Sequence, residues 1–463
     1  HLNFAPVADI NNNPLNQVIH IRSFGEEREN VAGKVVALMR GMQDHGLLVS
    51  AKHFPGHGDT GSDSHHALPL IPHDRSRLDS IELYPFKKAI ERGLTGIMMA
   101  HLHVPALDDR PNRATTLSRP VVTGLLREKM DFRGLIITDA LNMKGISDFF
   151  EPGQCEVEAV RAGNDILLMP ADVGRGISAI RQAVRSGDIS RERIDASCRR
   201  ILMAKYWAGL HRYRPVRTDS LLEDLNNRRY LLHRRKLIEH SLVLVKNRGS
   251  VLPLRELQNR RLATVTFSGK KDHTFAATSD LYVHGKHFTV SPSADHGTRS
   301  DLLMQLREYN TIIVNLFDLN LHAGRQYGIT DQALDLIAKV EPSSTLILNV
   351  AGTPYALGRL AGLEHADALI VSFSDDPLSQ DLVAQGIFGG IAFRGRLPVT
   401  VAPVAAAGEG CFTGPAIRLG YADPMEVGLN ADTLRRMEDV VRDAIRERAM
   451  PGCQLLVARN GKV

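Results

Sequence analysis

The densest group of chemically active side chains lies in residues 52–66, which read Lys-His-Phe-Pro-Gly-His-Gly-Asp-Thr-Gly-Ser-Asp-Ser-His-His. This stretch places four histidines and two aspartates within fifteen residues. Its proline and glycines favour a tight loop of defined shape, and such loops direct polar groups toward a ligand. The stretch therefore indicates proton transfer or ligand binding rather than an ordinary solvated loop.

Asp63 and His65 in this loop are spaced to form an acid/base pair. The carboxylate of Asp63 can orient the imidazole of His65 and raise its basicity, which leaves the second ring nitrogen available for a substrate proton. An unperturbed imidazole titrates near about pH 6.5, so one ring can act as acid and base in turn. Two exposed polar groups on a surface loop would give the same sequence.

Asp139 ends the apolar segment that begins at Gly134 and reads Gly-Leu-Ile-Ile-Thr-Asp. Cleavage of a glycoside commonly needs one carboxylate to attack the anomeric carbon and a second group to protonate the leaving oxygen. A carboxylate at the end of a buried strand suits the first of these roles. The same position also suits the N-cap of a helix that begins at Ala140.

Two further residues are candidates for substrate binding. Arg22 could bind a sugar hydroxyl or a carboxylate, although a single loop arginine is often only a surface residue. His101 follows the apolar segment 97–100 and could line a site, or it could be packed as a structural residue.

These residues lie within a pattern of alternating apolar strands and amphipathic helices over residues 1–212. The predicted strands are Phe4–Ala8, Leu47–Ala51, Gly96–Ala100, Leu135–Thr138 and Ile166–Met169. The predicted helices are Val31–His45, Leu78–Arg92 and Gly174–Ser186. The alternation predicts an α/β fold with a parallel sheet. Because the polar residues directly follow strands, we expect them at the carboxyl-terminal edge of a TIM-type (β/α)8 barrel, with a doubly wound sheet as the rival.

A closed eight-stranded barrel needs about 250 residues, and five β-α units are recognisable here. We therefore expect residues 1–212 to form an incomplete barrel that lacks its N-terminal units, and the chain to be a fragment.

The rest of the chain predicts three further parts. Residues 213–235 predict a helical connector, and residues 236–403 predict an α/β sandwich. The sandwich strands are predicted at Leu242–Lys246, Leu262–Phe267, Thr311–Phe317, Thr345–Val350 and Ala368–Phe373, with a helix at Asp331–Lys339. Residues 404–426 predict a linker. Residues 427–463 predict the truncated start of a third domain, with a helix from Asp432, a strand at 454–459 and a two-residue turn at Asn460-Gly461.

Composition excludes several classes of protein. The 463 residues are 43% hydrophobic and 24% charged, which is typical of globular domains. A net charge of +5, with arginines that are not interleaved with aromatic residues, argues against a nucleic-acid partner. No apolar run is long enough for a membrane span. The four cysteines are widely spaced and predict buried free thiols. A small-molecule partner is expected, and the oligomeric state is not predicted.

Taken in order, the motifs resemble glycoside hydrolase family 3 and, within it, the β-N-acetylhexosaminidase branch. The motifs are Asn3–Asp9, Arg22–Gly25, Lys52–Gly58, Asp63–His65, Ile97–His101 and Thr138–Met143. The resemblance implies a retaining enzyme that removes terminal β-linked N-acetylglucosamine through a covalent glycosyl-enzyme, without a metal or another cofactor.

The resemblance also implies a role for individual residues. Asp139 is the nucleophile, and His65, supported by Asp63, is the acid/base. The positions that match the family's contacts to sugar hydroxyls in subsite −1 are Arg22, Lys52 and His53. Fragments derived from peptidoglycan are the implied substrate, with chitin fragments as an alternative.

Two other parts of the chain carry a resemblance. Residues 236–403 resemble the second domain of the family, and residues 427–463 resemble the opening of a serine β-lactamase or penicillin-binding-type domain. Such a fusion implies a bacterial parent protein that is periplasmic or secreted. In the family, about two more β-α units and another sugar-binding aspartate precede the strand at Phe4.

Three other functions stay open. A metal-dependent hydrolase could use His53, His57, Asp59 and His65 as ligands, although the proline and glycines between them and the adjoining Lys52 disfavour it. A sugar-binding module without catalysis is the second. The third is a β-N-acetylglucosaminide phosphorylase, because a histidine acid/base repels phosphate less than a carboxylate does.

Overall fold

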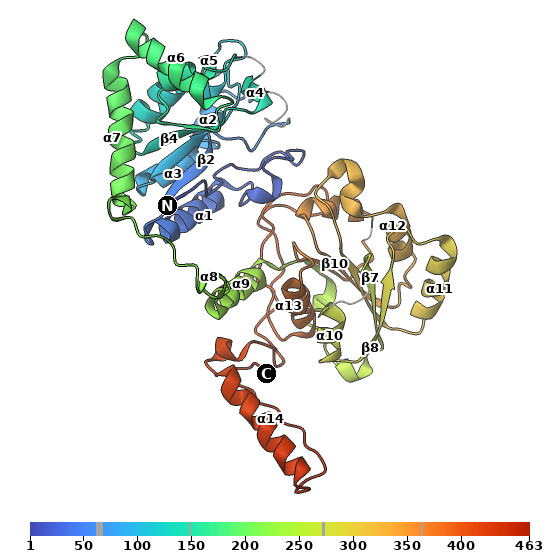
Figure 1. Ribbon diagram of the computed structural model, residues 1–463. Coiled ribbons are helices and arrows are strands. Elements are labelled where there is room, and N and C mark those ends of the chain that lie inside the picture. Colours follow the sequence, from blue (N-terminus) through green and yellow to red (C-terminus); the bar gives the residue numbers. More distant parts are fainter. Residues whose placement is uncertain (62–67, 148–149, 271–273, 363) are drawn as a thin grey trace. The chain divides into compact units, whose positions relative to one another are not determined.

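The computed structural model describes residues 1–61, 68–147, 150–270, 274–362 and 364–463. It divides into two compact units, His1–Val216 and Arg217–Val463 (Figure 1). Among the described residues, no helix is both long and apolar enough to cross a bilayer.

The first unit contains a parallel sheet. Its described strands pair in consecutive order and are β1 (Leu2–Asn3), β2 (Leu48–Phe54), β3 (Gly96–Met99), β4 (Leu135–Ala140) and β5 (Ile166–Leu168). β1 and β5 form the two edges of this sheet. The predicted α/β class and parallel sheet are therefore confirmed, and the described strands form part of a barrel-like wall rather than a closed barrel.

Helices follow the strands in the first unit. They are α1 (Arg28–Gln43), α2 (Arg75–Ser80), α3 (Tyr84–Glu91), α4 (Lys144–Ser147), α5 (Gln154–Ala162), α6 (Val173–Ser186) and α7 (Arg191–Trp207), with a π-helical segment at Pro120–Lys129. The core lies between the sheet and α1, α3 and the π-helical segment, and it includes Val35, Phe54, Phe86, Ile97 and Leu125. This packing fixes the strand ends that carry the candidate site.

Prolines account for two differences between the predicted and the observed elements of this unit. Residues 5–8 run beside β2 with parallel backbone hydrogen bonds, but the regular strand ends at Asn3, and Pro6 has no N–H to contribute to a ladder. The predicted helix Leu78–Arg92 is two helices, α2 and α3. Pro85 lies in the first turn of α3, where proline is tolerated, whereas it would disrupt the interior of one long helix.

The second unit contains a six-stranded sheet within its described residues. The strand order is β6 (Val243–Asn247), β11 (Ala368–Val371), β10 (Thr345–Val350), β9 (Thr311–Leu316), β7 (Leu262–Phe267) and β8 (Gly285–Val290). β6 is antiparallel to β11, and the other pairs are parallel. The sequence did not predict β8, because this edge strand is mostly half-exposed and has no continuous apolar run.

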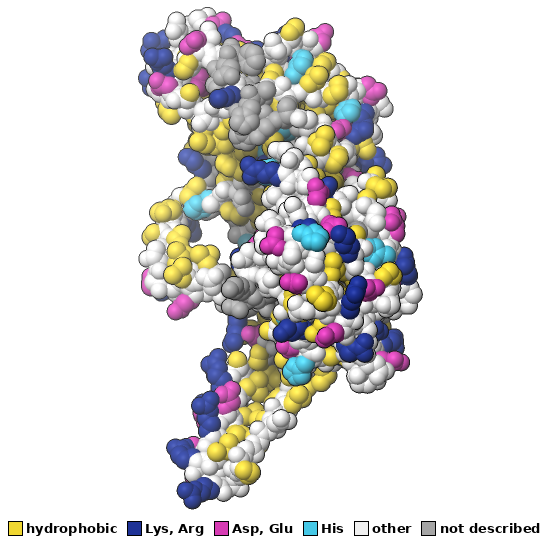
Figure 2. Space-filling model, turned by 90° about the vertical axis from the view of Figure 1, so that its right-hand side faces the viewer, with side chains coloured by type: hydrophobic (Ala, Val, Ile, Leu, Met, Phe, Trp, Pro, Cys, Tyr) yellow, Lys and Arg dark blue, Asp and Glu magenta, His cyan; other side chains and the backbone are white. Residues whose placement is uncertain are grey.

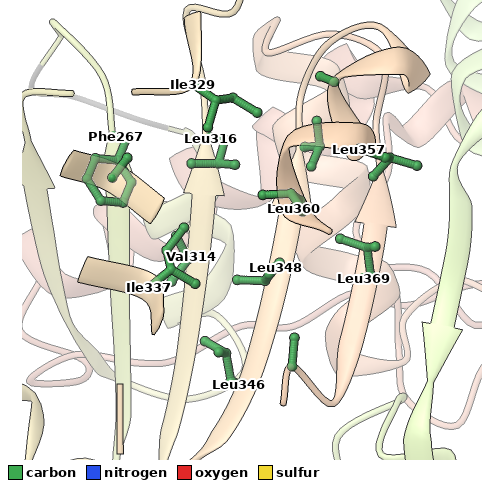
Figure 3. Close-up of a cluster of buried hydrophobic side chains, with 14 of the residues drawn as sticks. Phe267, Val314, Leu316, Ile329, Ile337, Leu346, Leu348, Leu357, Leu360 and Leu369 are labelled. Atoms are coloured by element: carbon green, nitrogen blue, oxygen red, sulfur yellow. The ribbon is translucent and has the colours of Figure 1, made fainter. Parts of the chain in front are cut away.

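Helices cover both faces of this second sheet. They are α9 (Arg228–Ser241), α10 (Thr274–Asp280), α11 (His296–Leu306), α12 (Asp331–Ala338) and α13 (Pro377–Phe388), whereas α8 (Leu221–Leu225) and α14 (Ala431–Arg446) have no buried residue. Alternate strand residues enter opposite cores: Val314 and Leu348 pack with Ile337 of α12, as Figure 3 shows, whereas Ile313 and Ile347 join the core of α10 and α13.

The segment that the sequence assigns to a linker, residues 404–426, hydrogen-bonds to the second unit. Cys411 N donates to Leu244 O at 2.7 Å, Ile417 N donates to Gly389 O at 2.9 Å, and Tyr421 N donates to Gln385 Oε1 at 2.8 Å. These bonds join the segment to β6 and to the end of α13.

The predicted turn near the C-terminus is present. Asn460 and Gly461 have φ angles of 51° and 74°, and Arg459 and Lys462 exchange two backbone hydrogen bonds across them. The adjoining helix α14 has no buried residue, and basic side chains lie along one edge of it beside a hydrophobic strip (Figure 2). The predicted strand at 454–459 is not formed.

All four cysteines are free, as predicted, but the expectation that they are buried holds only for Cys155, since Cys411 is half-buried and the other two are exposed. Cys155 is buried in the first unit, whereas Cys198 and Cys453 are exposed.

Candidate functional site

The strand ends of the first unit bring the candidate residues to one edge of the sheet. β2, β3 and β4 are parallel neighbours, so their carboxyl ends meet at the same edge. Lys52 and His53 are among the last three residues of β2, His101 follows β3, and Asp139 is the penultimate residue of β4. The sequence prediction that these residues share one rim is consistent with this arrangement.

Asp9 is the centre of the hydrogen bonds at this rim. Its carboxylate is fully buried and accepts from His53 Nδ1 at 2.7 Å, from His53 N at 3.1 Å and from His57 N at 2.7 Å. Burial alone would raise its pKa, but His53 and His57 outweigh this effect and hold the pKa of Asp9 below its ordinary value. Asp9 therefore fixes the path of residues 53–57 as a carboxylate anion.

His53 is held in one tautomer. Because the carboxylate of Asp9 only accepts, Nδ1 of His53 carries the proton, and Nε2 accepts from Arg22 Nη2 at 3.4 Å. The loop of Arg22 is itself tied to Asp9, since Ser23 Oγ donates to Asp9 O at 2.7 Å. The Arg22 side chain is exposed, so the guanidinium and the Nε2 edge of His53 can both face a ligand.

Lys52 lies close enough to the other charged groups of the rim to be affected by them. Burial and the like charge of Arg22 lower the pKa of Lys52, while the carboxylates of Asp139 and Asp9 act in the opposite direction. Asp139 is half-buried, and its Oδ1 accepts from Ala140 N at 2.9 Å. The charges of Arg22 and Asp139 therefore both act on Lys52 at this edge of the sheet.

His101 is engaged on both ring nitrogens. Nε2 donates to Ala140 O at 3.0 Å and Nδ1 lies 2.8 Å from Thr116 Oγ1, in a buried environment. These bonds connect the end of β3 to the residue that follows Asp139. The geometry favours a positioning role for His101 at the Asp139 strand end over direct binding of a ligand.

The comparisons with known proteins identify the family. Residues 1–204 match the glycosyl hydrolase family 3 N-terminal domain. A solved family 3 β-N-acetylglucosaminidase from Paenibacillus sp. str. FPU-7 is 30% identical, with a TM-score of 0.70 over 88% of this chain and 77% of that chain. The chain belongs to glycoside hydrolase family 3.

Curated relatives of this family 3 chain include two bacterial enzymes. β-Hexosaminidase A from Pseudoalteromonas piscicida is 36% identical over 275 residues, which are 55% of this chain and 45% of the relative. A β-N-acetylglucosaminidase/β-glucosidase from Cellulomonas fimi is 28% identical over 259 residues, 54% of this chain and 46% of the relative. The chain spans about half the length of the curated relatives it matches.

The predicted acid/base pair, Asp63 and His65, lies outside the described residues of this family 3 chain. The remaining predicted site residues are Arg22, Lys52, His53, His101 and Asp139, and all are described. His53 and Arg22 are in direct contact, and the charge of Asp139 acts on the pKa of Lys52 and of His57. The roles assigned to these residues from the sequence stay predictions.

Two residues to which the sequence analysis gave no role hold the family 3 site together. Asp9 is one, and its signal was its place directly after the first apolar segment. Asn16 is the other: it donates to His57 O at 2.8 Å and accepts from the backbone of Val18 and Ile19. No sequence spacing distinguishes Asn16 from the neighbouring Asn11–Asn13, because its role depends on a contact 41 residues away.

His57 provides a test of this buried arrangement. Burial lowers the pKa of His57 to about 4, with Asp9 opposing the shift, so the ring is neutral in the fold. Between pH 6.5 and 4 the unfolded chain binds a proton that the folded chain does not, and stability therefore falls as the pH is lowered. We expect wild type to lose up to about 3 kcal/mol more than His57→Asn between pH 7 and 4 in urea unfolding. The exposed His45→Asn is the control, and equal losses in all three proteins would contradict the assignment.

Gly58 provides a second test, of the packing between the two loops. A Cβ at this residue would lie 1.7 Å from Ile10 O, beside the Asp9 carboxylate that anchors the loop. We expect Gly58→Ala to destabilise the protein by about 2–3 kcal/mol through overpacking. Gly61→Ala is the matched control, since its Cβ would meet nothing within 4 Å. Equal midpoints of unfolding for the two variants would rule out this close approach.

Proposed function

We propose that this chain carries the nucleophile and subsite −1 of a retaining β-N-acetylhexosaminidase, which removes terminal β-linked N-acetylglucosamine from glycan or peptidoglycan fragments. The observation that carries the proposal is the shared sheet edge of Lys52 and His53, near the end of β2, and of Asp139, near the end of β4, with Arg22 in contact with His53. The activities of the relatives from Pseudoalteromonas and Cellulomonas support the glycosidase class and the N-acetylhexosamine substrate.

In the proposed reaction, Asp139 attacks the anomeric carbon and forms a covalent glycosyl-enzyme with inversion at that carbon. Water then attacks the same carbon from the opposite side, which restores the β configuration. His65, oriented by Asp63, protonates the leaving oxygen and then removes a proton from the water. His65 gives a proton to the leaving group in the first step and takes one from water in the second, so the acid/base is regenerated at the end of the cycle.

The described residues have a separate part in this scheme. Lys52 and Arg22 donate hydrogen bonds to sugar hydroxyls, and His53 presents Nε2 as an acceptor because Asp9 holds the proton on Nδ1. Asp9 and Asn16 keep these groups in place before the sugar arrives. Preorganised donors of this kind reduce the cost of orienting the substrate in the transition state.

The test is an assay of the chain with aryl β-N-acetylglucosaminide and aryl β-glucoside. We expect release of N-acetylglucosamine, first as the β anomer, and a strong preference for the N-acetylated substrate. Turnover of the glucoside alone would contradict the substrate class, and an initial α product would contradict retention. Adding phosphate distinguishes the acceptor, since a sugar 1-phosphate as the main product replaces hydrolysis by phosphorolysis. Loss of turnover on chelation, restored by metal, would favour the metal-dependent alternative.

A further inference from the structure

A second cluster of polar side chains lies beside residues 55–61, the described part of the catalytic loop that follows β2. His73 Nε2 lies 2.7 Å from Asp59 Oδ2, and Glu82 is close by, so that one potential ligand atom from each residue lies within 4.8 Å of the others. Histidine, cysteine and carboxylate side chains form one group of three among the described residues that is close enough to hold a metal ion, and it is this cluster.

Glu82 is the unusual member of this cluster. Its side chain is 4% exposed, and neither carboxylate oxygen has a hydrogen-bond partner among the described residues. Its ionic contact is Arg77 Nη2, 3.3 Å from Oε1. Buried carboxylates are normally paired and hydrogen-bonded, because an unsatisfied charge is expensive to bury. Burial raises the pKa of Glu82, with Arg77 opposing the shift, and Oε2 of the charged form has no partner among the described residues.

The backbone around Glu82 leaves little room for another solution. A Cβ at Gly56 would lie 2.8 Å from Glu82 Cβ, so the catalytic loop packs directly on this side chain. Gly56 also has a φ angle of 138°, a conformation that favours glycine. The first carbons of the Glu82 side chain are consequently packed against the loop that continues to Asp59.

We propose that Asp59, His73 and Glu82 bind one divalent transition-metal cation of the zinc type, which ties the catalytic loop to the residues just before α2 and to the segment between α2 and α3. One imidazole nitrogen and two carboxylate oxygens are ligands that Zn²⁺ accepts, with water in the fourth position. Ligand atoms around tetrahedral Zn²⁺ lie about 3.3 Å apart, so the cluster needs side-chain adjustments rather than a change of backbone. The cation takes the place of the proton on His73 Nε2 and partners the buried Glu82.

Arg77 competes for the same carboxylates. Its Nη2 lies 3.3 Å from Glu82 and 3.8 Å from Asp59, but its side chain is 37% exposed and its Nε is without a hydrogen-bond partner among the described residues. A long, partly exposed side chain can move into solvent when a cation binds. The site is structural and separate from the chemistry proposed at Asp139, and its presence or absence leaves the proposed glycosidase mechanism unchanged.

The experiment measures Zn²⁺ bound to the metal-free 463-residue chain by equilibrium dialysis at pH 7, with Co²⁺ absorption as a report on coordination. We expect one equivalent of Zn²⁺, at least about tenfold weaker binding in Glu82→Gln and in His73→Gln, and unchanged binding in the control Glu91→Gln, an exposed glutamate of α3. Co²⁺ should give the visible bands of a four-coordinate site in wild type, and these bands should be lost in His73→Gln.

The variant Arg77→Met distinguishes a metal site from a cluster that is held together by the ion pairs of Arg77 alone. This test remains valid if Glu82→Gln does not fold. We expect this variant to bind Zn²⁺ more tightly than wild type, because the competing charge is gone, and to recover on Zn²⁺ binding the thermal stability that it loses. Binding equal in wild type and in the Glu82 and His73 variants would overturn the proposal. So would an Arg77→Met chain that neither binds Zn²⁺ nor is stabilised by it.

Discussion

Replacing Asp139 by asparagine is expected to lower kcat on an aryl β-N-acetylglucosaminide by at least about 10⁴-fold, because loss of a nucleophile removes the covalent route altogether. Thermal stability should change little. Asp139 is half-buried, and its described hydrogen bond is to the amide of the next residue, which an asparagine side chain can retain. A kinetic loss without a stability loss is the signature of a residue that acts on the substrate.

The control for this variant is Asp131→Asn, an exposed carboxylate that precedes the same strand and pairs with Arg133. It should retain wild-type kcat. Asp139→Ala with added azide gives a positive test, since azide can occupy the vacated space and attack the anomeric carbon. We expect partial recovery of rate and an α-glycosyl azide as product. A kcat within tenfold of wild type for Asp139→Asn would exclude this carboxylate as the nucleophile.

Replacing Asp9 by asparagine is expected to have the second-largest effect, and on stability as well as activity. The carboxylate accepts hydrogen bonds from His53 and His57 in a fully buried position, so the amide loses the charge and places a donor opposite His53 Nδ1. We expect a loss of about 3 kcal/mol at pH 7. We also expect kcat/KM to fall by at least about 100-fold, because His53 and the loop after it lose their fixed geometry.

The pH dependence provides a further check on Asp9. Its pKa is lower in the folded chain than in the unfolded chain, so its stabilising contribution is present above the unfolded value near about 3.9 and is lost as the pH falls below it. The difference in unfolding free energy between wild type and Asp9→Asn should therefore shrink below about pH 4. The exposed Asp44→Asn is the control, and a difference that stays constant down to pH 2.5 would contradict the role of the anion.

The sequence predicted the parts of the fold that depend on local pattern. Apolar runs such as Leu262–Phe267 and Thr345–Val350 are continuous because these strands are buried on both faces, and both were predicted with the observed bounds. β8 was missed because an edge strand needs no such run. The predicted helix Leu78–Arg92 is divided because Pro85 is not tolerated in a helix interior, a constraint that the apolar spacing of this segment does not reflect.

The candidate site was predictable only in part, for a different reason. Asp139, Lys52 and His53 could be identified because each stands at the end of an apolar strand. Asp9 and Asn16 contribute through contacts across 41 to 48 residues of sequence, which no local pattern encodes. His101 was interpreted as a possible ligand contact, and only the structure shows that both of its ring nitrogens have protein partners.

The central claim, that Asp139 is the nucleophile of a retaining β-N-acetylhexosaminidase, is tested most directly by trapping the glycosyl-enzyme. A 5-fluoro-N-acetylglucosaminyl fluoride has a reactive leaving group and a ring fluorine that slows hydrolysis of the intermediate. After incubation with the chain and proteolysis, mass spectrometry should find one fluorinated sugar on the peptide that contains Asp139, bound through an ester to that carboxylate. A sugar attached to another residue, or a chain that binds the reagent and hydrolyses it without any label on Asp139, would contradict the account.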